Sequence, residues 1–211
     1  RHLIDTYIEA SAPRKISPFD DIGLLDLIVK TGIAEAIANK LANVKDNHEA
    51  VAESIENNVR SKLIKEQLTD PAFFERMSAL LDEIIRLRKQ KAIEYEEYLQ
   101  RIATLTRQVM SGKTDDTPKQ LNTPGRLALY NNLKAWVTTN TAGQPHAPYG
   151  GNDATVAMVM ALDASIKEHR PDGWRGVTAR EQLVKQAIYN VIKDIDAVNR
   201  IYPIVFAHKE Y

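Results

Sequence analysis

The stretch SGKT, from Ser111 to Thr114, has the residue types that close a phosphate-binding P-loop. In a complete P-loop a glycine stands five residues before the glycine of this stretch, and the loop follows a strand, so that backbone N–H groups cradle the phosphates. Arg107 occupies that position, and the residues before the stretch have a helical pattern. The sequence therefore predicts no nucleotide site here.

The histidines are the other residues that could support catalysis or bind a metal: His2, His48, His146, His169 and His208. None has the spacing of a metal motif such as H-E-x-x-H, and His48 with Glu49 lies in the first turn of a predicted helix, where a solvated role is simpler. The chain has no cysteine, which excludes a disulfide, a thiolate zinc site and a cysteine nucleophile. We expect no catalytic, cofactor-binding or metal-binding residue.

The densest basic run is RLRKQK, which spans residues 86–91. Its four cations are candidates for contacts with DNA phosphates: Arg86, Arg88, Lys89 and Lys91. The run also lies at the end of a predicted helix, where cations complement the helix dipole. Both interpretations stay open on the sequence alone.

The loop DGWRG, residues 172–176, places Trp174 beside Arg175. Tryptophan and arginine are the residue types that most often anchor protein interfaces, so these two are candidates for docking a partner. The alternative is that Trp174 staples two helices of the same chain. The spacing does not decide between these roles.

Helical patterns fill most of the sequence, and we predict an all-α fold with two lobes. Of its 211 residues, 44% are hydrophobic and 27% are charged, as in folded proteins. In the first lobe, residues 1–111, two amphipathic segments around a turn near Lys91 predict a long helical hairpin. Residues 112–123 are predicted to be a linker, and residues 124–211 a second helical lobe. Pro203 is expected to kink the last helix.

Helix ends are predicted from capping residues. Asp46 with Glu49 has the capping-box spacing, Asp70 precedes a proline, and Thr178 opens a later helix. Apolar stripes along the predicted helices define the expected core. They include Val29, Val51, Ile55, Val59, Leu63, Leu80, Met160, Leu183 and Phe206.

The segment from Ala50 to Glu66 contains an unusual pair of asparagines. Helical geometry places Asn57 toward water and Asn58 at the border of the apolar stripe, where we expect it to bond a neighbouring helix. Glu56 precedes Arg60 by four residues, the favourable order for an exposed ion pair. A ligand role for Asn58 is the alternative.

Charge and hydropathy limit the function further. Lys plus Arg and Asp plus Glu both number 28, which argues against an autonomous, strongly basic nucleic-acid binder. No apolar run approaches the length of about 18 residues that a membrane span needs. The absence of cysteine favours the cytoplasm. Because the chain begins at Arg1 without a leader pattern, we expect it to be part of a longer polypeptide.

Three segments in order carry a family resemblance: AVAESIENNVRSKLI, YEEYL, and DGWRG with the final tyrosine. Together with their surroundings, they resemble the C-terminal region of the R (HsdR) subunit of type I restriction–modification enzymes over nearly the whole chain. Asn57, Asn58 and Arg60 look like part of a structural signature, and no catalytic role of the family maps onto them.

The resemblance implies a helical fragment without activity of its own. In the parent subunit, an ATP-dependent site-specific deoxyribonuclease and DNA translocase, the nuclease and the motor that uses ATP and Mg²⁺ lie upstream. The C-terminal region is expected to help dock the subunit onto the methyltransferase and specificity subunits, near double-stranded DNA. The rival interpretations are a stand-alone helical protein-interaction module and a small enzyme, for which no convergent polar cluster is visible.

Overall fold

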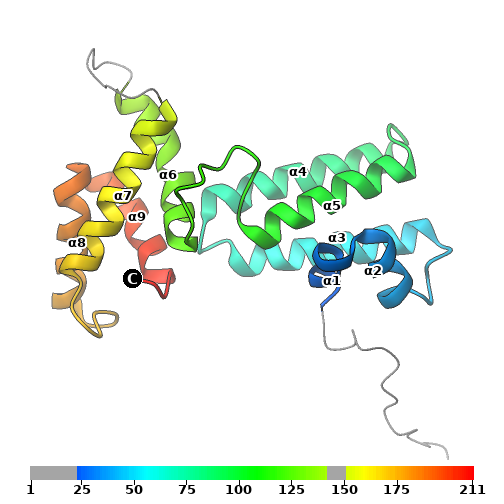
Figure 1. Cartoon of the computed structure of the whole chain (residues 1–211), viewed down its shortest axis with the longest axis horizontal. Helices are drawn as coiled ribbons and strands as arrows, with labels where there is room; N and C mark the ends of the chain where they lie inside the picture. Colours follow the sequence, from blue (N-terminus) through cyan, green and yellow to red (C-terminus); the bar gives the residue numbers. More distant parts are fainter. Residues whose placement is uncertain (1–22, 142–150) are drawn as a thin grey trace, which may run out of the picture.

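The computed structural model describes residues 23–141 and 151–211, and these residues form nine α-helices and no strand (Figure 1). The predicted all-α fold is confirmed. The helices are α1 (Leu24–Thr31), α2 (Ile33–Lys40), α3 (His48–Glu66), α4 (Pro71–Lys89), α5 (Tyr95–Ser111), α6 (Pro124–Thr141), α7 (Gly151–His169), α8 (Thr178–Ile192) and α9 (Ile195–Ala207). The predictions for residues 1–22 and 142–150, which include those for His2 and His146, lie outside the described residues.

The first hydrophobic core lies among α1 to α5. The stripe of Val51, Ile55, Val59 and Leu63 on α3 is buried, as its four-residue spacing predicts. Helices α4 and α5 run side by side as the predicted hairpin (Figure 1), and the turn between them places Lys91 at a φ of 52°. α1 packs against α2, α3 and α5.

The second hydrophobic core lies among α6 to α9 and includes Trp174 and Tyr211. The segment between the lobes contains no helix from Gly112 to Thr123, yet Leu121 within it is 1% exposed and packs into the second core. In Figure 1, α6 lies nearest the first lobe, and α7, α8 and α9 lie beyond it. α9 continues through Pro203 as one helix.

The caps differ from prediction at two of three positions. Asp70 does cap α4, since its carboxylate accepts from the Phe73 N–H at 3.2 Å. At α3 the cap is Asn47, which accepts from the Ala50 N–H at 3.1 Å, so the predicted Asp46 cap is wrong by one residue. Thr178 is the first residue of α8, and no side chain caps that helix.

Several predicted core residues lie at the surface. The exposed fractions are 43% for Val29, 39% for Leu80, 37% for Met160, 52% for Leu183 and 40% for Phe206. Neighbouring elements cover these side chains only in part; Phe206, for example, still packs edge-on against Trp174 with 5.6 Å between ring centres. None of the helices in the described parts is long and apolar enough to cross a bilayer.

Candidate functional site

Arg88, one of the four phosphate candidates, is buried inside the first lobe. Its Nε donates to Glu56 Oε1 at 2.9 Å, its Nη2 donates to Glu56 Oε2 at 3.2 Å, and its Nη1 bonds the Glu49 carboxylate. The side chains of Arg88 and Glu56 are only 9% and 8% exposed. Although burial alone would lower the pKa of Arg88, the hydrogen bonds that it donates to both glutamates raise it. This guanidinium therefore ties α4 to α3.

Tyr98 of α5 completes the buried cluster. The guanidinium carbon of Arg88 lies 5.6 Å from the centre of its ring, and the Tyr98 hydroxyl donates to the main-chain oxygen of Ala52 at 3.3 Å. Burial raises the pKa of this phenol. Three helices thus meet around one ion pair, an arrangement that the sequence pattern did not indicate.

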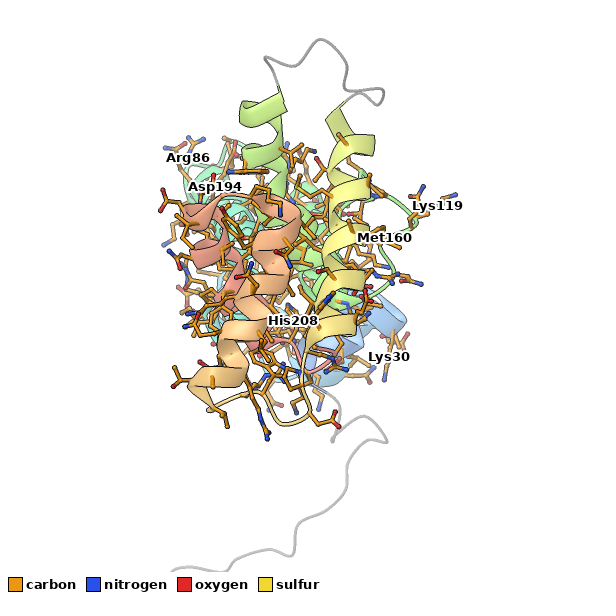
Figure 2. All side chains as sticks on the ribbon, turned by 90° about the vertical axis from the view of Figure 1, so that its left-hand side faces the viewer. Lys30, Arg86, Lys119, Met160, Asp194 and His208 are labelled. Atoms are coloured by element: carbon orange, nitrogen blue, oxygen red, sulfur yellow. The ribbon has the colours of Figure 1, made fainter. Side chains whose placement is uncertain are left out.

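The remaining cations of the basic run are at the surface. Arg86 donates to Gln90 at 3.1 Å within its own helix end, and Figure 2 shows it projecting at the edge of the molecule. Lys89 and Lys91 are also exposed. The structure therefore separates the run into one internal arginine and three accessible cations.

The signature residues of α3 lie on its solvent side. Arg60 donates to Asp82 of α4 at 2.7 Å, and Glu56 accepts from Arg88 of α4. The predicted Glu56–Arg60 pair is therefore wrong, because each residue pairs with a charged side chain of α4 instead. Asn58 donates to the main-chain oxygen of Ser54 at 2.8 Å within α3, so the predicted bond to a neighbouring helix is also wrong. Asn57 is exposed, as expected.

A shallow hollow between α3 and α4 brings some of these residues together. It has a volume of about 340 Å³ and is lined by Glu53, Glu56, Asn57, Arg60, Ile85 and Lys89. The lining offers two cations, two carboxylates and an amide, without a nucleophile next to a general base. Such a surface suits polar recognition rather than bond breaking.

Trp174 and Arg175 hold the end of the described chain. The indole is 2% exposed, and its Nε1 donates to the main-chain oxygen of Tyr211 at 2.9 Å. Arg175 donates to the main-chain oxygens of Phe206 at 2.8 Å and Tyr211 at 3.2 Å, and also bonds that of His208. Its guanidinium carbon lies 4.4 Å from the centre of the Trp174 ring.

This geometry is the stapling arrangement that the sequence left open. Because the indole faces the interior, Trp174 offers a partner almost no surface in this conformation. Arg175 is half-buried, and its Nε and both Nη atoms bond main-chain oxygens. Their docking role stays a prediction that would need the loop to open.

The second lobe contains a buried ion-pair cluster around Asp163 that was not predicted from the sequence. Asp163 is 3% exposed, and its carboxylate accepts from Arg126 Nη2 at 2.7 Å, from Lys167 at 2.6 Å and from the Tyr211 hydroxyl at 3.1 Å. Burial alone would raise the pKa of Asp163, but the hydrogen bonds from Arg126 and Lys167 hold it below its ordinary value. Only the four-residue spacing to Lys167 could have indicated it.

Among the described residues, no group of three or more His, Asp or Glu side chains is placed to hold a metal ion. Compared with protein-family models, with curated proteins and with solved structures, the chain matches none of them.

Proposed function

We propose that this chain is the C-terminal helical region of the R subunit of a type I restriction–modification enzyme, and that it supports docking of that subunit onto the methyltransferase core. The observation that carries the proposal is the ordered series of three segments that resemble this region. A single amphipathic helix is common in proteins, whereas three specific segments in one order are not.

The contacts among these segments support the proposal. Tyr98 of YEEYL bonds Ala52 of the first segment, and Tyr95 stacks on His48, two residues before that segment, with 3.8 Å between ring centres. Trp174 of DGWRG bonds Tyr211. The quoted segments therefore meet in pairs inside the two lobes, which fits an architectural role better than a catalytic one.

In this proposal the chain itself catalyses no reaction. ATP and Mg²⁺ act in the upstream motor of a cytoplasmic complex, and the specificity subunit reads the DNA sequence. The chain contributes helix faces to assembly. Its accessible cations Arg86 and Lys89 lie in the last turn of α4 and Lys91 lies in the turn after it, and in this proposal they contact the phosphates of nearby double-stranded DNA.

The direct test is capture of the purified chain by an immobilised complex of methyltransferase and specificity subunits. We expect saturable binding, and we expect excess chain to inhibit ATP-dependent cleavage by competing with the full-length R subunit for the same core. Absence of binding at micromolar concentration, with the chain shown to be helical by circular dichroism, would reject the proposal.

The DNA contact has its own test. Reversing Arg86, Lys89 and Lys91 to glutamate should weaken DNA binding by the assembled complex. It should also lower the slope of the salt dependence, because a complex with fewer phosphate contacts releases fewer counterions when it binds. The matched control reverses Lys30, Lys45 and Lys65, which are also exposed on the first lobe. Equal effects of the two triple variants would contradict a local contact.

Two exposed apolar side chains favour a second candidate, a stand-alone helical protein-interaction module. Ile64 is 68% exposed and Leu68 is 80% exposed near the end of α3. Contiguous exposed apolar patches are typical of surfaces that meet another protein, and these two side chains are four residues apart at one end of the first lobe. The capture experiment separates the candidates, because only the restriction subunit requires the methyltransferase core as its partner.

A further inference from the structure

The contact between the two lobes is centred on one buried carboxylate. Asp70 of the first lobe is 6% exposed, and its two oxygens accept from the side-chain amides of Asn131 and Asn132 on α6, each at 2.7 Å. The Asn132 side-chain oxygen in turn accepts from the Ala72 N–H at 3.2 Å. One acid thus joins the first turn of α4 to the middle of α6.

A further hydrogen bond between the lobes ends at the same place. His208, just after α9, lies with its Nε2 at 2.9 Å from the main-chain oxygen of Thr69. All of these bonds reach residues 69–72, so they meet at one end of the first lobe. A contact gathered at one point allows one body to turn against the other, because few other interactions need to break.

A cleft beside this contact gives the lobes room to move. It has a volume of about 370 Å³, and its walls come from both lobes. The apolar part of the lining is formed by Phe73, Phe74, Val109, Met110, Pro124 and Leu127. The neighbouring segment from Gly112 to Thr123 has no helix that would fix the lobe angle, and Gly112 has a left-handed φ of 66°.

We propose that Asp70 is the pivot of a pH-sensitive hinge, in which uptake of one proton by its carboxyl group favours the closed arrangement of the two lobes described above. The hinge does not depend on which partner the chain binds. It is a property of the contact between α4 and α6.

The direction follows from the environment of the carboxyl group. Burial raises the pKa of Asp70 from 3.8 to about 6, despite the hydrogen bonds that it accepts from Asn131, the Phe73 N–H and Asn132. Opening the lobes returns the group to water, so the closed state binds the proton more tightly. Closure is therefore favoured fully below about pH 4 and loses this contribution as the pH rises through about 6. Two pKa units correspond to a change on the order of a hundredfold in the closing equilibrium.

The other charged groups around Asp70 come from three elements. Arg76 on α4 acts on the carboxylate through its positive charge and lowers the pKa of Asp70. Lys62 and Glu66 on α3 line the cleft and pair with each other, and His208 lines it from the end of α9. Because His208 also bonds Thr69 across the contact, the experiment needs a variant that removes this imidazole.

The chain has no cysteine, so two introduced cysteines can carry a donor and an acceptor dye. Gln100→Cys on α5 and Gln186→Cys on α8 use exposed positions, one in each lobe. We expect energy transfer in the labelled full chain to shift as the pH rises from about 4 to about 7, the range set by the open-state and closed-state pKa values of Asp70. Asp70→Asn, which keeps the shape of the neutral acid, should hold transfer at its acid value throughout.

Two further variants make the test decisive. Asn131→Asp places a second carboxylate against Asp70 and should open the lobes at neutral pH and close them on acidification. His208→Gln should keep the wild-type midpoint. The proposal is overturned if transfer in the wild type does not change with pH, if Asp70→Asn titrates as the wild type does, or if His208→Gln alone removes the transition.

Discussion

Each lobe buries one carboxylate against an arginine from another helix, but the two lobes complete this cluster differently. In the first lobe, Glu56 on α3 meets Arg88 on α4, and Tyr98 on α5 closes the group. In the second lobe, Asp163 on α7 meets Arg126 on α6, and the closing tyrosine is Tyr211 beyond α9. The first cluster joins the middle of α3 to the last turn of α4 and the first turn of α5, whereas the second incorporates the end of the described chain.

Arg88 and Arg175, which the sequence suggested as contacts to other molecules, both bond groups within their own lobe. Arg88 satisfies a buried acid, and Arg175 bonds main-chain oxygens of residues 206–211. A buried charge without its partner costs several kcal/mol, so such arginines are held in place by the fold. Under the proposed function, the surfaces offered to a partner are therefore the exposed cations and the helix faces.

The largest expected effect is that of Trp174→Ala. Removing the buried indole leaves a cavity and a main-chain oxygen of Tyr211 without one of its donors, and we expect the second lobe to lose roughly 4 kcal/mol. Urea unfolding followed by the fluorescence of the remaining tryptophan, Trp136, measures this loss. Amide exchange in α3 and α5 should be unchanged, because these helices belong to the other core. Equal loss of protection in both lobes would contradict the expectation that the first lobe stays folded when the second is destabilised.

Arg88→Ala should be nearly as damaging, but to the first lobe. It leaves Glu56 buried without its main partner, at a cost of about 3 kcal/mol in the free energy of unfolding. The matched control is Arg86→Ala, two residues away and exposed, which should change stability by less than about 0.5 kcal/mol. If Arg88→Met combined with Glu56→Leu is no more stable than Arg88→Ala, the buried charge is not the cause.

The helical framework could be predicted from the sequence, because apolar spacing depends on the helix alone. The stripe on α3 and the start of α4 after Asp70 were both predicted. The polar partners could not be predicted in the same way. Glu56 and Arg60 are ideally spaced for each other, yet α4 offers Arg88 and Asp82 to them, a choice that depends on packing.

Loop geometry limited the prediction of the candidate sites in a different way. The residue types in DGWRG indicated an energetic anchor, and Trp174 is an anchor, but its partner lies 37 residues further along the same chain. Side-chain type does not tell whether an anchor faces a neighbour or its own core. Asp163 stayed unnoticed because its partners Arg126 and Tyr211 are distant in sequence.

The second lobe should also be the more acid-sensitive part through Asp163. Hydrogen bonds from Arg126 and Lys167 hold the pKa of this group below its ordinary value, so its contribution to stability is present above about pH 4 and is lost as the pH falls through the lowered pKa. We expect a smaller loss than in Arg88→Ala. Thermal unfolding of Asp163→Asn should lack this acid-dependent component, and an unchanged acid profile would refute the assignment.

The smallest expected effect concerns the start of α3. Asn47→Ala should destabilise the first lobe by about 1 kcal/mol, because it removes the acceptor for the Ala50 N–H. Asp46→Ala, the neighbouring substitution, should have almost no effect. Chemical denaturation of the two variants side by side measures the difference. If Asp46→Ala were the less stable variant, Asp46 rather than Asn47 would be the cap, as the sequence predicted.

The position of Tyr211 has a consequence for biosynthesis. Helices α1 to α5 contain everything that the first core needs, so this half can fold while later residues are still being translated. The second lobe cannot complete its core so early, because Trp174, Arg170 and Asp163 all bond Tyr211. Until that residue has left the ribosome exit tunnel, four helices remain without the group that closes their core.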